Sequence, residues 1–425
     1  MSTSSQVCLR CGEALDELDP RTRCPCGGLL DVRHPAPPWT GPELRAQLAS
    51  RHAATAPGAG SGVWRYRELI LPGHTGSDLI SLGEGDTPLL ACGPAAGWAG
   101  VDALLCKHEG WNPTGSFKDR GMAIGVTQAR RVAAQIVACA STGNTSASLA
   151  AYAARAGLRA LVLIPSGQVA SGKLAQAIGY GARTLLVRGD FDDCLRLLEA
   201  LAGRGGVYPL NSINPFRVEG QKTIVLELLQ QLEWTPPDWI VLPAGNLGNT
   251  AAFGKALEEA LAWGLIDRVP RLAAVQAEGA AAFAWGFEEN FARRRRVRAE
   301  TIATAIRIGD PASWDRAVRS IRRTNGVVTR VSDEEILEAK SVIDGAGIGC
   351  EPASAAALAG LRRLVGQGTI RRTESVVAVL TGHLLKDPGS LEAMHLRGQP
   401  RGAWANPPLE VDATLEAVVA AAGMG

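Results

Sequence analysis

No run of about 18 apolar residues occurs in this sequence, so it lacks a segment long enough for a membrane-spanning helix. It also lacks an N-terminal stretch in which basic residues precede an apolar core, the pattern of a secretory signal. Neither charge sign dominates, because 44 Lys and Arg face 42 Asp and Glu, which gives a net charge of +2. We therefore expect a cytoplasmic protein whose partners include neither a membrane nor a nucleic acid.

One basic run, Arg293–Arg296, stands out from this balance. Such a run is compatible with a polyanion site, but a solvated helix end or loop is the simpler interpretation. The composition is that of a globular protein, with 46% hydrophobic and 20% charged residues. A chain of 425 residues is long enough for two or three domains with a sizeable core.

Cysteine is sparse and unevenly placed. Five of the nine cysteines lie singly in apolar segments, as buried reduced thiols do: Cys92, Cys106, Cys139, Cys194 and Cys350. The other four form two close pairs within residues 1–34, Cys8 with Cys11 and Cys24 with Cys26. Two thiolate pairs across a short hairpin predict a tetrahedral zinc site, with a degenerate ribbon or free thiols as the alternatives. His34 is a substitute ligand in principle, but we interpret it as a bystander.

Apolar runs alternate with helix-like segments through most of the chain. The predicted strands are Ile136–Ala140, Leu158–Ile164, Arg183–Val187, Trp239–Pro243, Arg271–Ala277 and Ser375–Leu380. The predicted helices are Met122–Ala134, Ser146–Ala156, Gly172–Tyr180, Phe191–Ala202, Ser332–Ile343 and one that follows Gly245–Asn249 and ends near Leu265. This alternation predicts βαβ units in an α/β fold, with ligands bound at the carboxyl ends of parallel strands.

The segment Asn112–Gly121 (NPTGSFKDRG) places Lys118 just before a predicted helix. Pro113 and Gly115 interrupt regular structure ahead of it. The positive end of the helix dipole disfavours a second positive charge at this position. A partly desolvated Lys118 would therefore lose its proton near neutral pH, as a Schiff-base lysine must. The alternative is a surface lysine paired with Asp119 or a neighbouring acid.

Three turns that follow predicted strands carry polar groups. Ser141–Thr145 (STGNT) offers hydroxyls and free backbone N–H groups to an anion such as a carboxylate, although the same residues are ordinary helix caps. Ala244–Thr250 (AGNLGNT) has two glycines three residues apart, which lets backbone donors surround a phosphate, and it lacks the Lys-Ser/Thr of a nucleotide P-loop. In the third turn, the Thr381 hydroxyl either faces a neutral ring nitrogen or is structural.

Together these features describe a single ligand. Pyridoxal phosphate needs a Schiff-base lysine, a phosphate cup and a partner for its ring nitrogen, and it needs no metal. Lys118, Gly245–Asn249 and Thr381 match these needs in turn. A further glycine-rich stretch, Gly345–Gly349, follows a predicted helix rather than a strand, so it does not fit a dinucleotide-binding loop.

The sequence resembles the pyridoxal-phosphate enzymes of the tryptophan-synthase β fold (fold type II), and among them the threonine synthase family. The motifs that carry the resemblance are Asn112–Gly121, Ser141–Thr145, Gly245–Asn249 and Thr381–Pro388, supported by Gly172–Gln176, Asn211–Thr223, Ala303–Gly309 and Glu351–Ala355. Many members of the family also carry an N-terminal Cys-rich ribbon similar to residues 8–30.

The resemblance implies a two-domain α/β fold in which helices wrap parallel and mixed sheets and the cofactor lies at the domain interface. The expected parts are a zinc-ribbon-like segment at 1–34, a large domain at 35–121 and 210–425, and a smaller mobile domain at 122–209. A homodimer is expected as well.

The resemblance also implies a role for each motif residue. Lys118 would be the Schiff-base lysine and proton shuttle, Asn144 would bond the phenolic oxygen of the cofactor, and Thr381 its ring nitrogen. The cofactor phosphate would lie against Gly245, Asn246, Leu247, Gly248 and Asn249. The substrate carboxylate would be bound by Ser141, Thr142, Asn144 and Thr145, and the substrate phosphate by Asn211, Ser212 and Arg217.

The implied enzyme is a carbon–oxygen lyase acting on phosphates, which converts O-phosphohomoserine and water to threonine and phosphate. One alternative is a paralogue that uses another phosphorylated amino acid, such as O-phosphoserine in a β-replacement. The other is a non-catalytic cofactor-binding protein that recruits a macromolecule. Two positions depart from the family pattern, since Leu384 stands where glycine is usual and Gly345–Cys350 replaces an aromatic-containing run. Both lie near the expected cofactor edge, so we expect a different backbone shape after Thr381.

Overall fold

A computed structural model describes residues 4–52, 61–74, 79–167, 171–396 and 405–423. The chain separates into two units, Met1–Lys386 and Asp387–Gly425. The second unit contains α14 (Pro388–Leu391), the π-helical turn η6 (Glu392–Leu396) and α15 (Leu415–Ala421). Every other element, and the candidate site, belongs to the first unit. Among the described residues, no helix is both long and apolar enough to cross a membrane.

The larger sheet of the first unit has six strands in the order β12-β11-β10-β13-β5-β4. Their bounds are β4 Leu89–Ala91, β5 Leu104–His108, β10 Trp239–Pro243, β11 Arg271–Ala277, β12 Val327–Val331 and β13 Val376–Leu380. All neighbours are parallel except β4, which runs antiparallel to β5. In the central register, Val241 pairs with Ala273 on one side and Ala378 on the other.

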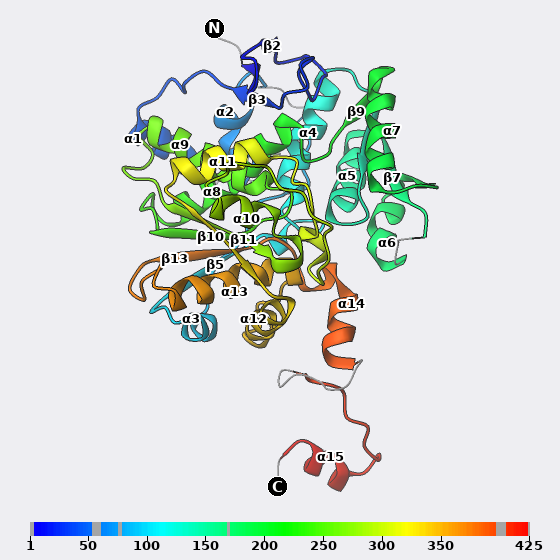
Figure 1. Cartoon of the computed structure of the whole chain (residues 1–425), viewed down its shortest axis with the longest axis vertical. Coiled ribbons are helices and arrows are strands. Elements are labelled where there is room, and N and C mark those ends of the chain that lie inside the picture. The colour runs from blue at the N-terminus through cyan, green and yellow to red at the C-terminus, as the bar shows by residue number, and fades with distance from the viewer. Residues whose placement is uncertain (1–3, 53–60, 75–78, 168–170, 397–404, 424–425) are drawn as a thin grey trace. The chain divides into compact units, whose positions relative to one another are not determined.

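Helices cover both faces of this sheet (Figure 1). On one face lie α4 (Lys118–Arg131), α8 (Pro215–Gln231) and α9 (Gly248–Ala262), and on the other α3 (Gly93–Ala99), α12 (Asp333–Gly345) and α13 (Pro352–Gly366). Successive strand residues point to opposite faces, so Ile240 packs in one hydrophobic cluster and Val241 in the other. Burial on both faces explains why these strands read as continuous apolar runs.

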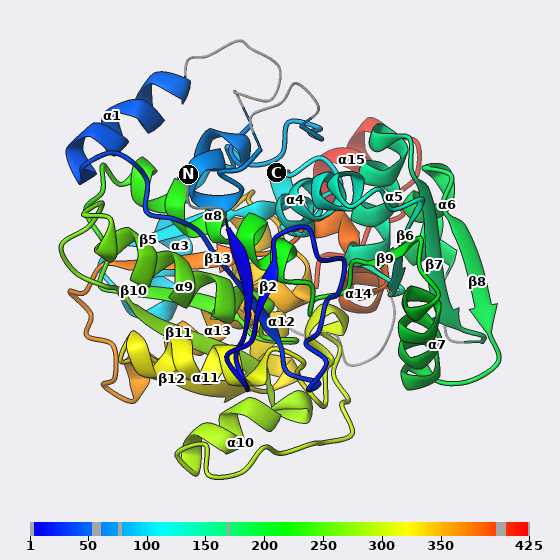
Figure 2. The same ribbon diagram turned by 90° about the horizontal axis from the view of Figure 1, so that it is seen from above.

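The smaller sheet has four parallel strands in the order β8-β7-β6-β9. Their bounds are β6 Ile136–Ala140, β7 Arg159–Pro165, β8 Arg183–Val187 and β9 Val207–Pro209. Seen from above, α5 (Asn144–Ala156) and α6 (Ser171–Gly179) lie on one side of it and α7 (Phe191–Gly203) on the other (Figure 2). The carboxyl ends of β6 and β10 lead directly into the predicted turns at 141–145 and 244–250.

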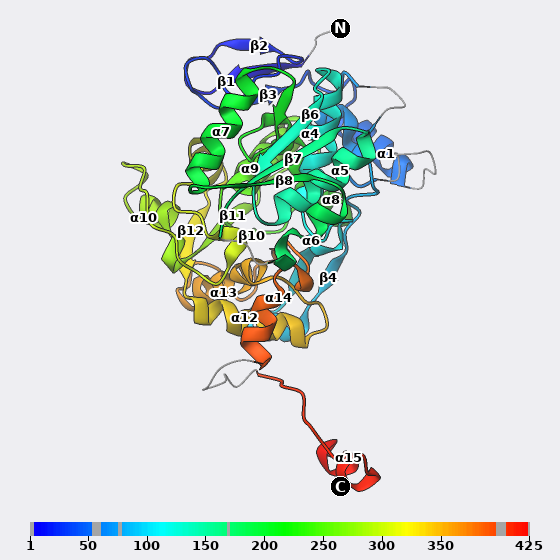
Figure 3. The same cartoon turned by 90° about the vertical axis from the view of Figure 1, so that its right-hand side faces the viewer.

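The N-terminal segment forms a three-stranded antiparallel sheet, with β1 (Ser5–Cys8) between β2 (Ala14–Asp16) and β3 (Leu30–Arg33) (Figure 3). The other elements are α1 Gly41–His52, η1 Trp64–Tyr66, α2 Arg67–Ile70, η2 Glu109–Trp111, η3 Glu278–Ala280, α10 Ala282–Glu288, η4 Thr304–Ile306, α11 Trp314–Arg323 and η5 Leu384–Lys386. The arginines of the run Arg293–Arg296 form ion pairs with Glu289 or Asp310.

The predicted α/β class is confirmed, and four predicted strands (β6, β8, β10 and β11) have the predicted bounds. The helix after Lys118 begins at Lys118 itself, four residues before the predicted start. The sequence analysis did not identify α8 or α13 as helices. Asn214 caps α8, because its side chain accepts hydrogen bonds from the backbone N–H groups of Phe216 and Arg217 ahead of the apolar run. The domain boundaries at 121 and 209 stay predictions.

A network of buried charged side chains joins one strand of the larger sheet, β5, to two helices that cover it, α4 and α8. Glu227 on α8 accepts hydrogen bonds from Lys107 Nζ on β5 at 2.6 Å and from Arg120 Nη2 on α4 at 2.7 Å. Arg120 also donates to both carboxylate oxygens of Glu109, at 2.6 and 2.8 Å. Burial alone would raise the pKa of Glu227, but the charges of Arg120 and Lys107 outweigh it and hold that pKa well below its usual range. The network therefore fixes α4, whose first residue is Lys118, against α8 and β5.

Replacing Glu227 by Gln is expected to lower the free energy of unfolding by about 3–5 kcal/mol, because it leaves Lys107 and Arg120 incompletely compensated in the interior. Urea denaturation at pH 7 measures the change. The matched control is Asp102→Asn, which breaks the exposed pair with Arg372 and is expected to leave stability essentially unchanged. Equal effects of the two substitutions would contradict this role for the network.

Candidate active site

A cavity of about 430 Å³ lies at the carboxyl ends of the strands of both sheets. Its wall includes these predicted residues: Lys118, Ser141, Thr142, Asn144, Thr145, Asn211, Ser212, Gly245, Asn246, Leu247, Gly248, Asn249 and Thr381. Segments separated by more than two hundred residues in the sequence thus meet around one space, as expected at the carboxyl ends of parallel strands. Arg217 is the predicted pocket residue that does not line the cavity.

Lys118 is the first residue of α4, with Phe117 at the N-cap. The segment before it is fastened to the end of β13, since Phe117 N donates to Thr381 O at 3.0 Å and His383 N to Gly115 O at 2.9 Å. Burial, reinforced by the nearby charge of Arg217 and opposed by that of Glu351, lowers the pKa of Lys118 to about 7. Near neutral pH, a large fraction of this amine is therefore unprotonated.

Asp119 does not hold the Lys118 amine in place. Its carboxylate accepts hydrogen bonds from Thr114 N at 2.7 Å and from the hydroxyls of Thr114 and Ser148, each at 2.6 Å. Asp119 thus ties the segment before α4 to α5. The interpretation of Lys118 as a surface lysine paired with this acid is not supported by these contacts.

The turn at Gly245–Asn249 has the shape of an anion cradle. A side chain at Gly245 would meet Ile306 Cα at 2.8 Å, so only glycine allows the backbone to pass there. Leu247 adopts the left-handed conformation, with φ of 64°, and α9 begins at the next residue. The first N–H groups of a helix lack intrahelical partners and favour an anion. The buried Asn249 Oδ1 and Thr250 Oγ1 also have no partner among the described residues.

Two contacts hold the walls of the cavity together. Asn211 pairs with the backbone of Ala140 at the end of β6, through one donated and one accepted hydrogen bond of 3.1 Å each. Asn246 Nδ2 donates to Ser212 Oγ at 2.6 Å, so the 211–212 turn touches the turn before α9. These contacts place Asn211 and Ser212 between the turn at 141–145 and the cradle.

Arg217 lies behind this wall and is 1% exposed. Its Nη1 donates to Leu210 O at 3.0 Å, while Nε and Nη2 have no partner among the described residues. Burial lowers the pKa of Arg217 to about 10. A buried guanidinium with two unused donors is costly unless an anion comes close to it.

The sequence analysis assigned no role to five polar residues of the cavity wall: Gln221, Thr304, Arg307, Glu351 and Lys386. Glu351 is the N-cap residue of α13 and accepts a hydrogen bond from Asn144 Nδ2 at 3.0 Å. The signal for it was an acid directly before Pro352, since proline at the first position marks the start of a helix. The other residues lie inside the motifs quoted above, but their sequence positions do not show that their side chains reach the cavity. Only the fold shows this.

The two departures from the family pattern lie against each other. A side chain at Gly349, whose φ is 69°, would meet Leu384 Cβ at 3.3 Å and Cδ2 at 3.4 Å. Leu384 begins the 3-10 turn η5, and a backbone shape different from that of the family stays a prediction. Leucine at 384 and the glycine-rich run at 345–349 are therefore matched in size.

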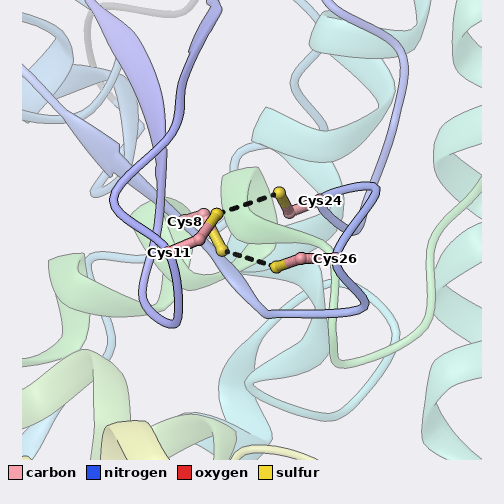
Figure 4. A group of neighbouring side chains, drawn as sticks. All are labelled: Cys8, Cys11, Cys24 and Cys26. Atoms are coloured by element: carbon pink, nitrogen blue, oxygen red, sulfur yellow. Dashed lines mark hydrogen bonds between the residues drawn. The ribbon is translucent and has the colours of Figure 1, made fainter.

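The four cysteines of the N-terminal segment form one cluster (Figure 4). Their sulfur atoms all lie within 4.8 Å of one another, with Cys8 Sγ 3.5 Å from Cys26 Sγ and Cys11 Sγ 3.6 Å from Cys24 Sγ. Four sulfurs around a zinc ion with bonds of about 2.3 Å would be separated by about 3.8 Å, so the donor set fits that metal. His34 lies elsewhere, 2.9 Å from Glu219 Oε2 on α8.

Comparisons with known proteins agree with this geometry. A family model described as pyridoxal-phosphate dependent enzyme matches residues 80–382. The threonine synthase of Methanocaldococcus jannaschii is 45% identical over 391 residues, which cover 90% of this chain and 93% of that protein. The chain belongs to the threonine synthase family. The predicted resemblance and the predicted cofactor class are thereby confirmed.

Other members of the family are similarly close. The threonine synthase of Mycobacterium tuberculosis is 48% identical over 325 residues, which cover 76% of this chain and 88% of that protein. The crystal structure of threonine synthase from Escherichia coli covers 96% of this chain and 93% of its own, with a TM-score of 0.69 at 19% identity. At that identity the structure establishes the shared fold.

Lys118→Met is expected to stabilise the cofactor-free protein at low pH. Because the pKa of Lys118 is lowered on folding, the unfolded chain binds more protons between pH 7 and 10, and the wild type gains stability as the pH rises through that window. Below pH 7 the penalty is full, about 1–2 kcal/mol once water in the cavity is allowed to screen the amine. Urea denaturation at pH 6 and pH 10 should show a difference between variant and wild type that shrinks at the higher pH. A constant difference would show that the Lys118 pKa is not lowered.

Proposed function

We propose that this chain converts O-phosphohomoserine and water to threonine and phosphate with bound pyridoxal phosphate. The observation that carries the proposal is the meeting of Lys118, the cradle at Gly245–Asn249 and the turn at Ser141–Thr145 around one cavity, in a member of the threonine synthase family. The buried Arg217 guanidinium, whose Nε and Nη2 have no partner among the described residues, favours a substrate that carries a second anionic group.

We assign the cofactor contacts from the wall of the cavity. Lys118 Nζ would bind the cofactor covalently, Asn144 would donate to its phenolic oxygen, and Thr381 to its ring nitrogen. The backbone N–H groups of Gly245–Asn249, at the positive end of α9, would hold its phosphate. When bound, pyridoxal phosphate supplies an electron sink that stabilises negative charge at the substrate α-carbon.

We assign the substrate contacts to two further segments of the cavity wall, Ser141–Thr145 and Asn211–Ser212. The hydroxyls and backbone N–H groups of Ser141–Thr145 bind the α-carboxylate at the start of α5. Asn211 and Ser212 bind the substrate phosphate directly, and Arg217 stabilises its charge from behind. A phosphate held in this way is oriented before it leaves from Cγ.

Lys118 carries the proton transfers in this proposal. An amine with a pKa of about 7 both accepts and returns protons near neutral pH, as a general base and acid must. Once the substrate amine has displaced it from the cofactor, Lys118 Nζ would take the proton from Cα. A second proton then leaves Cβ and phosphate leaves Cγ. One proton is returned to Cγ, water adds its hydroxyl at Cβ while its other proton goes to the phosphate, and the last proton is returned to Cα, which gives threonine.

We further propose that Cys8, Cys11, Cys24 and Cys26 bind one structural zinc ion. We also propose a mobile smaller domain at 122–209, a homodimer and a cytoplasmic location. O-phosphoserine used in a β-replacement is the second candidate substrate, because it carries the same carboxylate and phosphate groups.

Purified protein with pyridoxal phosphate is expected to release phosphate and threonine from O-phosphohomoserine. The Lys118→Ala variant should lose visible cofactor absorption in the free enzyme and about 10²–10⁴-fold of the turnover. Phosphate release and amino-acid analysis measure the reaction. Turnover of O-phosphoserine with a thiol or sulfite, without turnover of O-phosphohomoserine, would replace the first proposal by the second.

One zinc ion per chain is expected by elemental analysis of the purified protein. Cys8→Ser should lose the metal and lower the thermal midpoint of unfolding, because a structural zinc site contributes directly to folding. The matched control is Cys194→Ala, which removes a buried thiol of α7 outside the cluster and should retain the zinc. Full zinc content in Cys8→Ser would contradict the assignment.

A further inference from the structure

The first turn of α13 faces the two residues that we assign to the cofactor ring. Glu351 is the N-cap residue and Ser354 lies one turn further, and they are 4% and 0% exposed. Glu351 N donates to Gly382 O at 3.1 Å, and Gly382 N donates to Ser354 Oγ at 3.0 Å. These two backbone contacts fasten the start of α13 to the end of β13, directly beside Thr381.

The Ser354 hydroxyl contacts the Thr381 hydroxyl. Ser354 Oγ accepts from Gly382 N and lies 3.0 Å from Thr381 Oγ1, a contact in which either hydroxyl can donate. When Ser354 donates, Thr381 is the acceptor toward it and retains its own proton for another group. Thr381 Oγ1 donates to Glu351 Oε1 at 3.5 Å, a long hydrogen bond for which a ring nitrogen at ordinary distance would be the better acceptor.

Glu351 controls the Asn144 amide in the same way. Asn144 Nδ2 carries two protons and gives one of them to Glu351 Oε2 at 3.0 Å. The amide nitrogen is thereby directed to Glu351, which also lines the cavity, and its second proton remains for a phenolic oxygen. Without the carboxylate, either end of the amide could face the cavity.

We propose that Glu351 and Ser354 are positioning residues that set the directions in which Asn144 and Thr381 donate to the bound cofactor ring. The inference rests on the proposed cofactor contacts of this site. It concerns binding and electronic state of the cofactor rather than the identity of the substrate, so it is testable apart from turnover.

The two residues act on the Lys118 nitrogen in opposite senses. The Glu351 carboxylate favours the protonated nitrogen by its charge. A Thr381 proton donated to the ring nitrogen withdraws electrons from the ring and disfavours protonation of the lysine nitrogen joined to it. The other charged groups at the site, Arg217 on α8, Arg307 after η4 and Lys386 in η5, stay the same in both variants.

The test compares Ser354→Ala and Glu351→Gln as holoenzymes. Each should weaken pyridoxal-phosphate binding about three- to tenfold, the range for one misdirected hydrogen bond. A pH titration of the visible cofactor band should move its midpoint to higher pH in Ser354→Ala and to lower pH in Glu351→Gln. The control is Ser320→Ala, which removes a buried hydroxyl bonded to the Arg316 carbonyl in α11 and should keep the wild-type affinity and midpoint.

Shifts of both midpoints in the same direction, or wild-type midpoints in both variants, would overturn the proposal. Should Ser354→Ala not fold, the isosteric Glu351→Gln still decides the Asn144 half, and Ser354→Thr, which keeps the hydroxyl, should restore the wild-type midpoint. Opposite shifts in a protein that does not turn over O-phosphohomoserine would leave this inference standing and reject the proposed substrate.

Discussion

The active-site geometry depends on the buried carboxylate of Glu227. It accepts hydrogen bonds from Lys107 and Arg120 in the protein interior, where an uncompensated charge is strongly destabilising. Moving any one of the three side chains away from the other two would therefore destabilise the fold. Through them α8 is bound to β5 and to α4. Because Lys118 is the first residue of α4, this arrangement of charges positions it together with the hydrogen bonds that fasten the preceding loop to β13 and α5.

The same low-dielectric interior explains the chemistry of the site. Where acids and bases match, as around Glu227, burial produces rigid pairing. Where a buried basic group lacks a matching acid, burial changes its chemistry. It lowers the pKa of Lys118, and it leaves Arg217 with two donor atoms that have no partner among the described residues. The cavity wall also carries Arg307, Lys386 and the N-terminal residues of α9, with Glu351 as its one carboxylate among the described lining residues. This excess of positive over negative groups suits a cofactor and a substrate that each carry phosphate.

The sequence was most informative where the pattern is local. Apolar runs identified strands such as Trp239–Pro243 because both of their faces are buried, and the turns after them carried recognisable donors. It was least informative where long-range contacts decide the outcome. Helix α8 was missed because its buried face carries charges, including Glu219 and Glu227, whose partners lie on other elements. Glu351 was missed as a cavity residue for the same reason, since its hydrogen-bond partner Asn144 lies 207 positions away in the sequence. Arg217 was placed in the right neighbourhood, but its depth behind the wall depends on packing against α4 that no motif records.

The N-terminal segment is better understood as a support for α8 than as a separate module. Lys255 on α9 donates to Asp31 of β3 at 3.1 Å and to Glu219 of α8 at 2.6 Å, and Glu219 is also contacted by His34 and Lys222. Glu219 lies two residues after Arg217 on the same helix. The contacts that attach the segment therefore converge on the turn of α8 that presents the unmatched guanidinium. The segment that carries the cysteine cluster is thus attached to α8 through Asp31 and His34, so order in residues 31–34 contributes to the position of the helix turn that carries Arg217.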